Sequence, residues 1–260
     1  MGKRVGIVGY GLLGSYLVRK LNGEKEIDIA FVYDVDRNKL KDLDPSLVIK
    51  SLAEAPSRRP DLVVEMVNSE WVSENAAFVL EFSDLLIASV SAFADEKLNE
   101  KLDSVAELNR RRYYISHGAI AGLDGIRDGK EIIKEVKITT IRPEHGYFDL
   151  KDIIKKKMKA RTVIYEGPVR KACRLFPKNV NLFATVAIHG LGFDQTQCAI
   201  VVDPEIDIIQ HFIEVKGQGL RWKIEVQAIP IGDRKKVYVP ESFFQTVRRI
   251  CSEKYGEVLI

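Results

Sequence analysis

The feature that most constrains this chain is a glycine-rich turn close to its beginning. An apolar segment, residues 5–8, runs directly into Gly9-Tyr10-Gly11-Leu12-Leu13-Gly14, which has the spacing G-x-G-x-x-G. In this pattern the first glycine permits a tight turn out of a strand, and the second lets a pyrophosphate approach the main chain. The third lets the next helix pack closely on the sheet. The N–H groups of Leu12, Leu13 and Gly14 would then open a helix whose positive end faces the phosphates.

The segments after the glycines have the periodicity expected of a βαβ unit. Residues 15–21 predict a helix, and residues 27–33 predict a second buried strand that ends at Asp34, twenty residues after Gly14. A carboxylate at this position can accept both ribose hydroxyls of an adenosine. Glycines also mark ordinary turns, so a plain βαβ unit is the alternative. The strand, the helix and the acid together favour a dinucleotide site.

Apolar strands and amphipathic helices continue to alternate through the first half of the chain. A polar helical stretch follows Asp34. Short buried strands joined by helices are typical of a parallel sheet with right-handed crossovers, so we predict an α/β fold with a doubly wound parallel sheet. The expected strands cover residues 61–67, 84–90 and 112–116, and the expected helices cover residues 70–80 and 95–110.

Further cofactor contacts are expected where these strands end. Ligands of doubly wound sheets sit beyond the carboxyl ends of the strands. Met66 and Val67 close one expected strand, and Ser89 and Val90 close the next. We therefore predict that these four residues wall the cofactor cleft.

The second half of the chain has a different pattern, with alternating strands and few helices. Such a pattern favours an α+β domain with a mixed or antiparallel sheet. We expect a first domain over residues 1–134, a second over 135–240 and a C-terminal helix within 241–260 that packs back on the first domain. The second-domain elements are expected as strands at 136–142, 162–165, 197–202, 208–215 and 221–227 and helices at 168–176 and 180–190, the latter capped by Asn179.

Composition excludes several classes of partner. The 40 basic and 37 acidic residues are well mixed and leave a net charge of +3, so no nucleic-acid partner is expected. No apolar stretch approaches the roughly 18–20 residues needed to span a bilayer, so no membrane partner is expected either. Cys173, Cys198 and Cys251 are scattered without C-x-x-C spacing, which predicts reduced thiols, no metal site and a cytoplasmic location.

A dinucleotide fold joined to a second domain suggests hydride transfer, which at neutral pH needs a group that takes a proton. His is the usual choice, and there are four. His189 lies within an apolar helix, where a satisfied core histidine is expected. His117 at a strand end, His145 in a loop and His211 within a strand stay open as candidates. Asn181 lies inside an apolar helix, where a cofactor carboxamide could pair with its amide.

Several further motifs carry a family resemblance that covers nearly the whole chain. Together they resemble the L-aspartate dehydrogenase family, including the animal aspartate dehydrogenase domain-containing proteins. The motifs are the glycine turn at 9–14, Ser91-Ala92-Phe93-Ala94-Asp95, the segments 118–124, 165–167 and 176–181, and Asp203-Pro204 with His211 and Gly217.

The resemblance implies a Rossmann domain joined to an α+β domain that forms a homodimer. It also implies NAD(P)-dependent oxidative deamination of L-aspartate to iminoaspartate, then to oxaloacetate and ammonia. The family's catalytic His falls on His211, a cofactor-contacting Asn on Asn181 and a main-chain contact on Ala119. Asp34 favours NAD because a carboxylate repels a 2′-phosphate, while Arg37 leaves NADP as an allowed cofactor.

The chain departs from the family where the substrate is expected. Ile209 stands where family members often carry Asn, and His117 replaces a Ser. The microbial Asn-Pro-Lys-Thr-Ser segment has no counterpart in residues 234–240. A dehydrogenase of another small amino or oxo acid, or a non-catalytic NAD(H)-binding protein, are therefore the alternatives. The groups expected to hold a small dicarboxylic substrate are His117, Arg142, Lys178 and Lys216.

Overall fold

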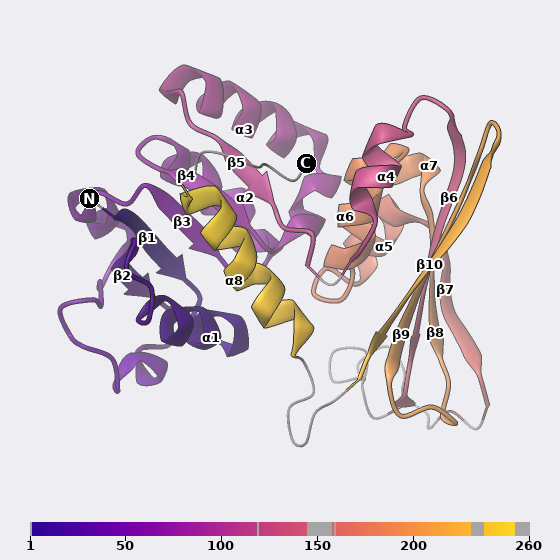
Figure 1. Cartoon of the computed structure of the whole chain (residues 1–260), viewed down its shortest axis with the longest axis horizontal. Helices are drawn as coiled ribbons and strands as arrows, with labels where there is room; N and C mark the ends of the chain where they lie inside the picture. Colours follow the sequence, from indigo (N-terminus) through magenta and orange to yellow (C-terminus); the bar gives the residue numbers. More distant parts are fainter. Residues whose placement is uncertain (1, 119, 145–157, 159, 230–236, 253–260) are drawn as a thin grey trace.

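The structure, a computed structural model, describes residues 2–118, 120–144, 158, 160–229 and 237–252. The chain forms two units that lie side by side (Figure 1). A five-stranded sheet is the centre of each unit. No helix among the described residues is long and apolar enough to cross a membrane.

The first unit is a parallel sheet in the order β2-β1-β3-β4-β5. From β1 the chain crosses to β2 on one side and later returns to β3 on the other, so the direction of winding reverses between β1 and β3. This confirms the expected doubly wound sheet. Its strands are β1 (Lys3–Val8), β2 (Ile27–Tyr33), β3 (Leu62–Glu65), β4 (Asp84–Ile87) and β5 (Tyr113–Ile115).

Helices cover both faces of this sheet. Leu62, Val64 and Leu86 point to the face packed by α1 (Leu12–Leu21) and α8 (Tyr238–Cys251). Their strand neighbours point to the face packed by α2 (Ser69–Leu80) and α3 (Glu96–Asn109). This division follows from the period-two alternation of side chains along a strand. The C-terminal helix α8 thus packs against α1 and the first sheet.

The second unit has a mixed sheet in the order β10-β9-β6-β8-β7. Only β6 and β8 are parallel, which confirms the expected α+β character. Its helices lie between the sheet and the first unit, so the other sheet face turns outward (Figure 1). The strands are β6 (Ile133–Arg142), β7 (Thr162–Pro168), β8 (Gln197–Val202), β9 (Ile209–Gly217) and β10 (Leu220–Ala228), and the helices are α4 (Leu123–Asp128), α5 (Val169–Leu175), α6 (Asn181–His189) and α7 (Gly192–Gln195).

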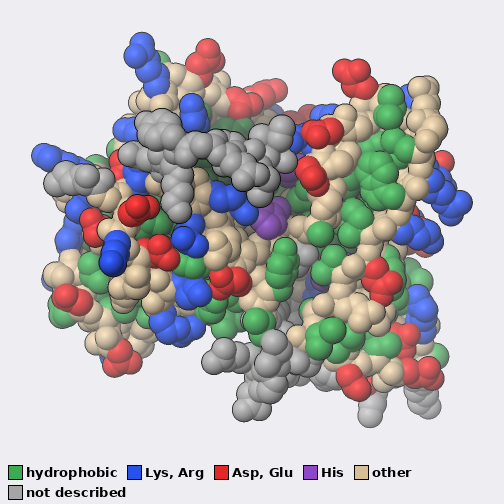
Figure 2. Space-filling view, viewed as in Figure 1, with side chains coloured by type: hydrophobic (Ala, Val, Ile, Leu, Met, Phe, Trp, Pro, Cys, Tyr) green, Lys and Arg blue, Asp and Glu red, His purple; other side chains and the backbone are tan. Residues whose placement is uncertain are grey.

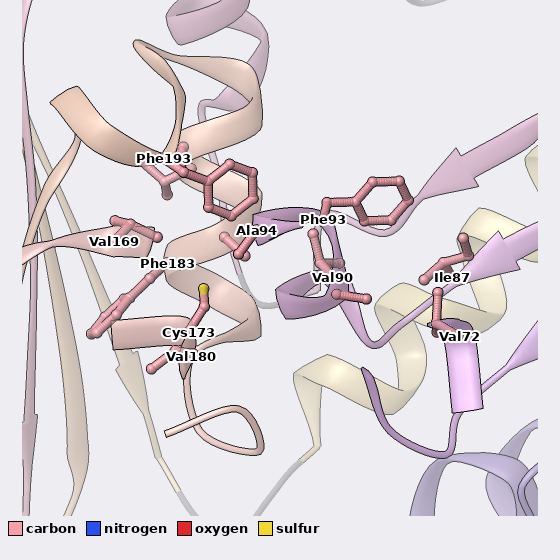
Figure 3. Close-up of a cluster of buried hydrophobic side chains, with 14 of the residues drawn as sticks. Val72, Ile87, Val90, Phe93, Ala94, Val169, Cys173, Val180, Phe183 and Phe193 are labelled. Carbon is pink, nitrogen blue, oxygen red and sulfur yellow. The ribbon is translucent and has the colours of Figure 1, made fainter. Parts of the chain in front are cut away.

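One apolar core continues from unit to unit. A short 3-10 helix after β4, η3 (Val90–Ala94), points Val90 and Phe93 into this core. Cys173 of α5 and Phe183 of α6 belong to the same core on the side of the second unit (Figure 3). The helices of the second unit thus pack directly on the loop that follows β4. The two units are therefore held in a fixed relation by packing.

Two local expectations are wrong. The stretch after Asp34 forms two short 3-10 helices, η1 (Arg37–Leu40) and η2 (Leu52–Arg58), instead of one polar helix. Between them the chain returns to the sheet edge through a single parallel bridge of Val32 and Val48. The second concerns Asn179, because the N-cap of α6 is Val180, without a side-chain cap bond. The Asn179 side chain binds Arg142 instead.

Candidate cofactor cleft and active site

The glycine turn has the close approaches that a diphosphate site requires. Gly9 has φ +95°, and a Cβ there would lie 2.5 Å from the carbonyl oxygen of Met66. A Cβ on Gly14 would lie 2.0 Å from the carbonyl oxygen of Gly9, so the start of α1 packs directly on the turn. A Cβ on Gly11 would meet nothing within 4 Å. The main chain is thus open at Gly11, where a pyrophosphate would approach.

Asp34 is a buried, ionised carboxylate at the end of β2. It accepts hydrogen bonds from the main-chain N–H groups of Tyr10 (2.7 Å) and Asp36 (2.8 Å), and Lys39 Nζ lies 3.3 Å away. Burial alone would raise the pKa of Asp34, but these two N–H groups and the Lys39 ammonium hold the pKa below its usual value. The acid therefore keeps its charge beside the glycine turn, where an adenosine ribose would lie.

Exposed apolar side chains gather at the same edge of the sheet. Leu12 follows β1, Val35 follows Asp34 and Val67 follows β3, and all three are solvent-exposed. Large apolar groups that converge on a cleft are typical of ligand sites. Val35 was missed by sequence reasoning, although its position directly after the acid was a usable signal. Together with the glycine turn and Asp34, these residues fit a dinucleotide.

The loops after β3 and β4 are joined by a buried acid that sequence reasoning also missed. Glu65, the last residue of β3, binds the main-chain N–H groups of Val67 (2.7 Å), Ala88 (3.2 Å) and Ser89 (3.0 Å). It also accepts the Ser89 hydroxyl at 2.7 Å. Its only sequence signal was a carboxylate within an apolar run.

The four residues expected to wall the cleft have different surroundings. Met66 is half-buried beyond β3, and Val67 is exposed beside it. Ser89 is buried because its N–H and hydroxyl both bind Glu65. The Val90 side chain packs into the core between the units, so only its main chain could face a cofactor (Figure 3).

In the second unit, His211 lies on the sheet face that carries the helices. It pairs with Thr140 across β9 and β6, and its Nδ1 lies 2.9 Å from the Thr140 hydroxyl. Thr140 is buried, so this contact orients the ring. Arg142 lies two residues further along β6, which places it on the same face. Its guanidinium donates to the Asn179 side chain and carbonyl, both at 3.0 Å.

Hydrogen bonds at the start of α6 connect this face to the first unit. The Asn181 side-chain oxygen accepts the main-chain N–H of Ser91 at 2.9 Å, and the Ser91 hydroxyl donates to the carbonyl of Pro177 at 2.8 Å. Since Asn179 lies two residues before Asn181, the Arg142 guanidinium is tied to the same turn. The turn that Arg142 binds and the loop after β4 thus meet at one junction, and Arg142 lies on the sheet face of His211.

The structure does not bring every expected residue to this junction. Lys216 lies five residues along β9 from His211, on the opposite face, and forms an ion pair with Glu135 at 2.5 Å. Lys178 is exposed in the turn before α6. Ala119 and His145 lie outside the described residues. His189 donates to the carbonyl of Thr185 within its own helix, as a satisfied core histidine would.

His117 is directed at the C-terminal helix. Its Nε2 accepts from Arg249 Nη2 at 3.1 Å and lies 3.4 Å from the Thr246 hydroxyl, both on α8. Burial lowers the pKa of His117, and the neighbouring Arg249 charge lowers it further. A neutral His117 therefore links the loop after β5 to α8.

The surface seen in Figure 2 has no region of a single charge sign; basic and acidic side chains are interspersed over both units. A Rossmann unit packed on a second α+β unit through the loops at its strand ends is the architecture of the nicotinamide-dependent dehydrogenases.

Comparison with known proteins agrees with this class. Residues 9–116 match the family model "Homoserine dehydrogenase, NAD binding domain", and residues 124–250 match "Aspartate dehydrogenase, C-terminal". The L-aspartate dehydrogenase of Thermotoga maritima is 31% identical over 95% of this chain and 97% of its own. The aspartate dehydrogenase domain-containing protein of Xenopus tropicalis is 34% identical over 83% of this chain and 80% of its own.

A solved structure agrees over the full length. The crystal structure of the Thermotoga maritima aspartate dehydrogenase superposes with a TM-score of 0.77, at 28% identity, over 99% of this chain and 100% of that one. The chain belongs to the aspartate dehydrogenase family.

Proposed function

We propose that this protein oxidises L-aspartate with NAD, NADP being the second allowed cofactor. L-aspartate, water and the oxidised cofactor would give oxaloacetate, ammonium, the reduced cofactor and one proton. The observation that carries the proposal is the junction where Asn181 binds Ser91, which joins the His211 face of the second unit to the cleft of the first. The family relationship supports aspartate as the substrate.

The cofactor would be held by main-chain groups and one acid. The turn Gly9, Gly11 and Gly14 with the N–H groups of Leu12 and Leu13 would bind the diphosphate, and Asp34 would bind the adenosine ribose. Met66, Val67, Ser89 and the main chain at Val90 would line the cleft, and Asn181 and Ala119 would close it. When bound, the nicotinamide supplies a hydride acceptor for the substrate α-carbon.

His211 is the proposed proton-transfer group. Loss of the hydride and of a proton from the amine nitrogen turns aspartate into iminoaspartate, and addition of water then releases ammonia. We assign to His211 Nε2 either the amine proton or the activation of that water. The contact between Nδ1 and Thr140 supports this role because it orients the ring. Arg142 is assigned to the substrate carboxylates, together with Lys178, which precedes the Arg142 partner Asn179 in the sequence.

The test is aspartate-dependent NADH formation in wild type and His211→Ala. We expect kcat to fall by about 10²–10⁴-fold, the usual contribution of a general acid or base, with NADH affinity unchanged. His189→Gln is the matched control, since His189 is bonded within α6. It should keep its rate within a few-fold. Equal rates in wild type and His211→Ala would remove the catalytic assignment.

A second candidate is oxidation of another small amino or oxo acid. It is favoured by Ile209, an apolar side chain on the same strand face as His211, where a polar group would help to hold a carboxylate. A panel of amino and oxo acids read at the NADH absorbance band separates the two. A protein that binds NAD(H) but oxidises none of them would be a binding protein without catalysis.

The assembly and location are also proposals. We infer a homodimer in the cytoplasm. The outward face of the second sheet, which no described helix covers, supports a second copy as the partner (Figure 1). The three cysteines are free and buried, in line with a reducing compartment.

A further inference from the structure

Glu65 is a buried carboxyl group for which the proposed reaction has no use. Its side chain is 0% exposed, and its two oxygens accept four hydrogen bonds from Val67, Ala88 and Ser89. Three of these donors are main-chain N–H groups, which cannot accept a hydrogen bond in return. Burial of a carboxylate costs free energy of folding. A buried site with four converging donors therefore indicates that a negative charge at this position has a function.

The position of Glu65 in the sheet suggests that task. It ends β3, at the point where the winding of the sheet reverses, and β3 is the direct neighbour of β1. In the proposed binding mode, Asp34 at the end of β2 binds the adenosine ribose, and the glycine turn after β1 binds the diphosphate. The remaining half of a dinucleotide, the nicotinamide riboside, must then extend over β3 and β4. Glu65 ends β3 and binds the loop after β4, so this half would pass close to its carboxyl group.

The two redox states of the cofactor differ in charge at this end. The oxidised nicotinamide ring carries one positive charge, and the reduced ring carries none. We propose that the Glu65 carboxylate is a specificity-determining charge that favours the oxidised over the reduced cofactor. This inference rests on one part of the proposed function, namely that the ligand is a nicotinamide dinucleotide.

The protonation state of Glu65 sets the conditions of the test. Burial raises the pKa of Glu65, while the bonds from Ser89, Val67 and Ala88 oppose the rise. Binding is therefore best measured at about pH 9, where the carboxylate form is favoured. Glu65→Gln keeps the shape and removes the charge. Its amide carbonyl can accept from Ala88 and Ser89, and its amide NH2 can donate to the Ser89 hydroxyl oxygen, so the Val67 N–H and the Ser89 O–H lose the acceptor that they have in wild type.

The experiment is competition of NAD⁺ against bound NADH, followed by NADH fluorescence. It gives the ratio of the two dissociation constants directly, in protein that NADH itself keeps folded. In Glu65→Gln we expect the ratio Kd(NAD⁺)/Kd(NADH) to rise on the order of tenfold. A charge pair about 10 Å apart gives this size of effect at an effective dielectric of about 20. Glu65→Asp keeps the charge and shortens the side chain, so its ratio should stay at the wild-type value.

Each outcome decides the proposal. A shifted ratio in Glu65→Gln with an unshifted ratio in Glu65→Asp supports it. An unchanged ratio in both, or an equal shift in both, would show that Glu65 acts through loop geometry alone and overturns it. So would a Glu65→Gln protein that stays unfolded with NADH present. If wild type binds neither NAD⁺ nor NADH, the proposed function itself has failed, and with it the ligand on which this inference depends.

Discussion

At the residue scale, Asp34 governs which cofactor the cleft accepts. Its carboxylate is fixed by the N–H groups of Tyr10 and Asp36, and its lowered pKa keeps it charged near neutrality. A fixed negative charge attracts ribose hydroxyls and repels a 2′-phosphate. Lys39 lies against the same carboxylate, so removal of the acid would leave a cation where a 2′-phosphate would lie.

Asp34→Ser is therefore expected to weaken NAD binding by about ten- to a hundredfold, the range that loss of a charged hydrogen-bond partner gives. Affinity for NADP should fall less or rise, because the repulsion is gone and Lys39 remains. Titration calorimetry with both cofactors measures the change in preference. The matched control is Asp36→Ser, an exposed acid two residues away that caps η1. A preference that moves equally in both variants would contradict the role of Asp34.

At the element scale, the sequence pattern predicted the ten strands and six of the eight α-helices of the described residues, because burial imposes their periodicity. The short helices α4 and α7 were not predicted. Strand ends were predicted less well. The expected strands 61–67 and 84–90 stop at Glu65 and Ile87. The N–H groups of Met66 and Ala88 still bind strand carbonyls, but those of Val67 and Ser89 bind the Glu65 side chain instead. Asn179 looked like a helix cap, but a distant arginine binds it. No local pattern reports such long-range bonds.

Two glycines of the glycine turn, Gly11 and Gly14, are predicted to respond differently to substitution by alanine. Gly11→Ala adds a methyl group that meets no protein atom within 4 Å, so the thermal midpoint should stay unchanged. That methyl group would stand where the diphosphate approaches, and we expect NAD affinity to fall at least about tenfold. Gly14→Ala puts its methyl group 2.0 Å from the Gly9 carbonyl oxygen. Overpacking of this kind costs about 1–3 kcal/mol of unfolding free energy.

Differential scanning calorimetry and NAD titration on both variants check the pair. The expected result is that Gly11 is required for NAD binding and Gly14 for the stability of the fold. A Gly11→Ala protein that binds NAD as well as wild type does would mean that the diphosphate does not pass over Gly11.

At the scale of the whole molecule, the site is a product of the contact between units. Sequence reasoning found His211, Asn181 and Arg142 singly, but their convergence depends on the shared core and on the bond from Ser91 to Asn181. The partner of His117 on α8 lies 132 residues away in sequence, and the ion pair of Lys216 could not be anticipated either. Tertiary pairing of polar groups is therefore the part that a single sequence left undetermined.

The outward face of the second sheet carries the last prediction, the proposed homodimer. Val163 of β7 pairs with Val201, whose side chain points away from the helices, so Val163 faces outward and is 56% exposed. If this face meets a second copy, Val163→Glu would bury an unpaired charge in the interface and shift the protein toward monomer. Leu108→Glu, at an 82% exposed position on α3 in the first unit, is the matched control and should stay dimeric. Sedimentation velocity over a concentration series distinguishes the species. A wild type that sediments as a monomer throughout, or a Val163→Glu dimer as stable as wild type, would place the interface elsewhere or remove it.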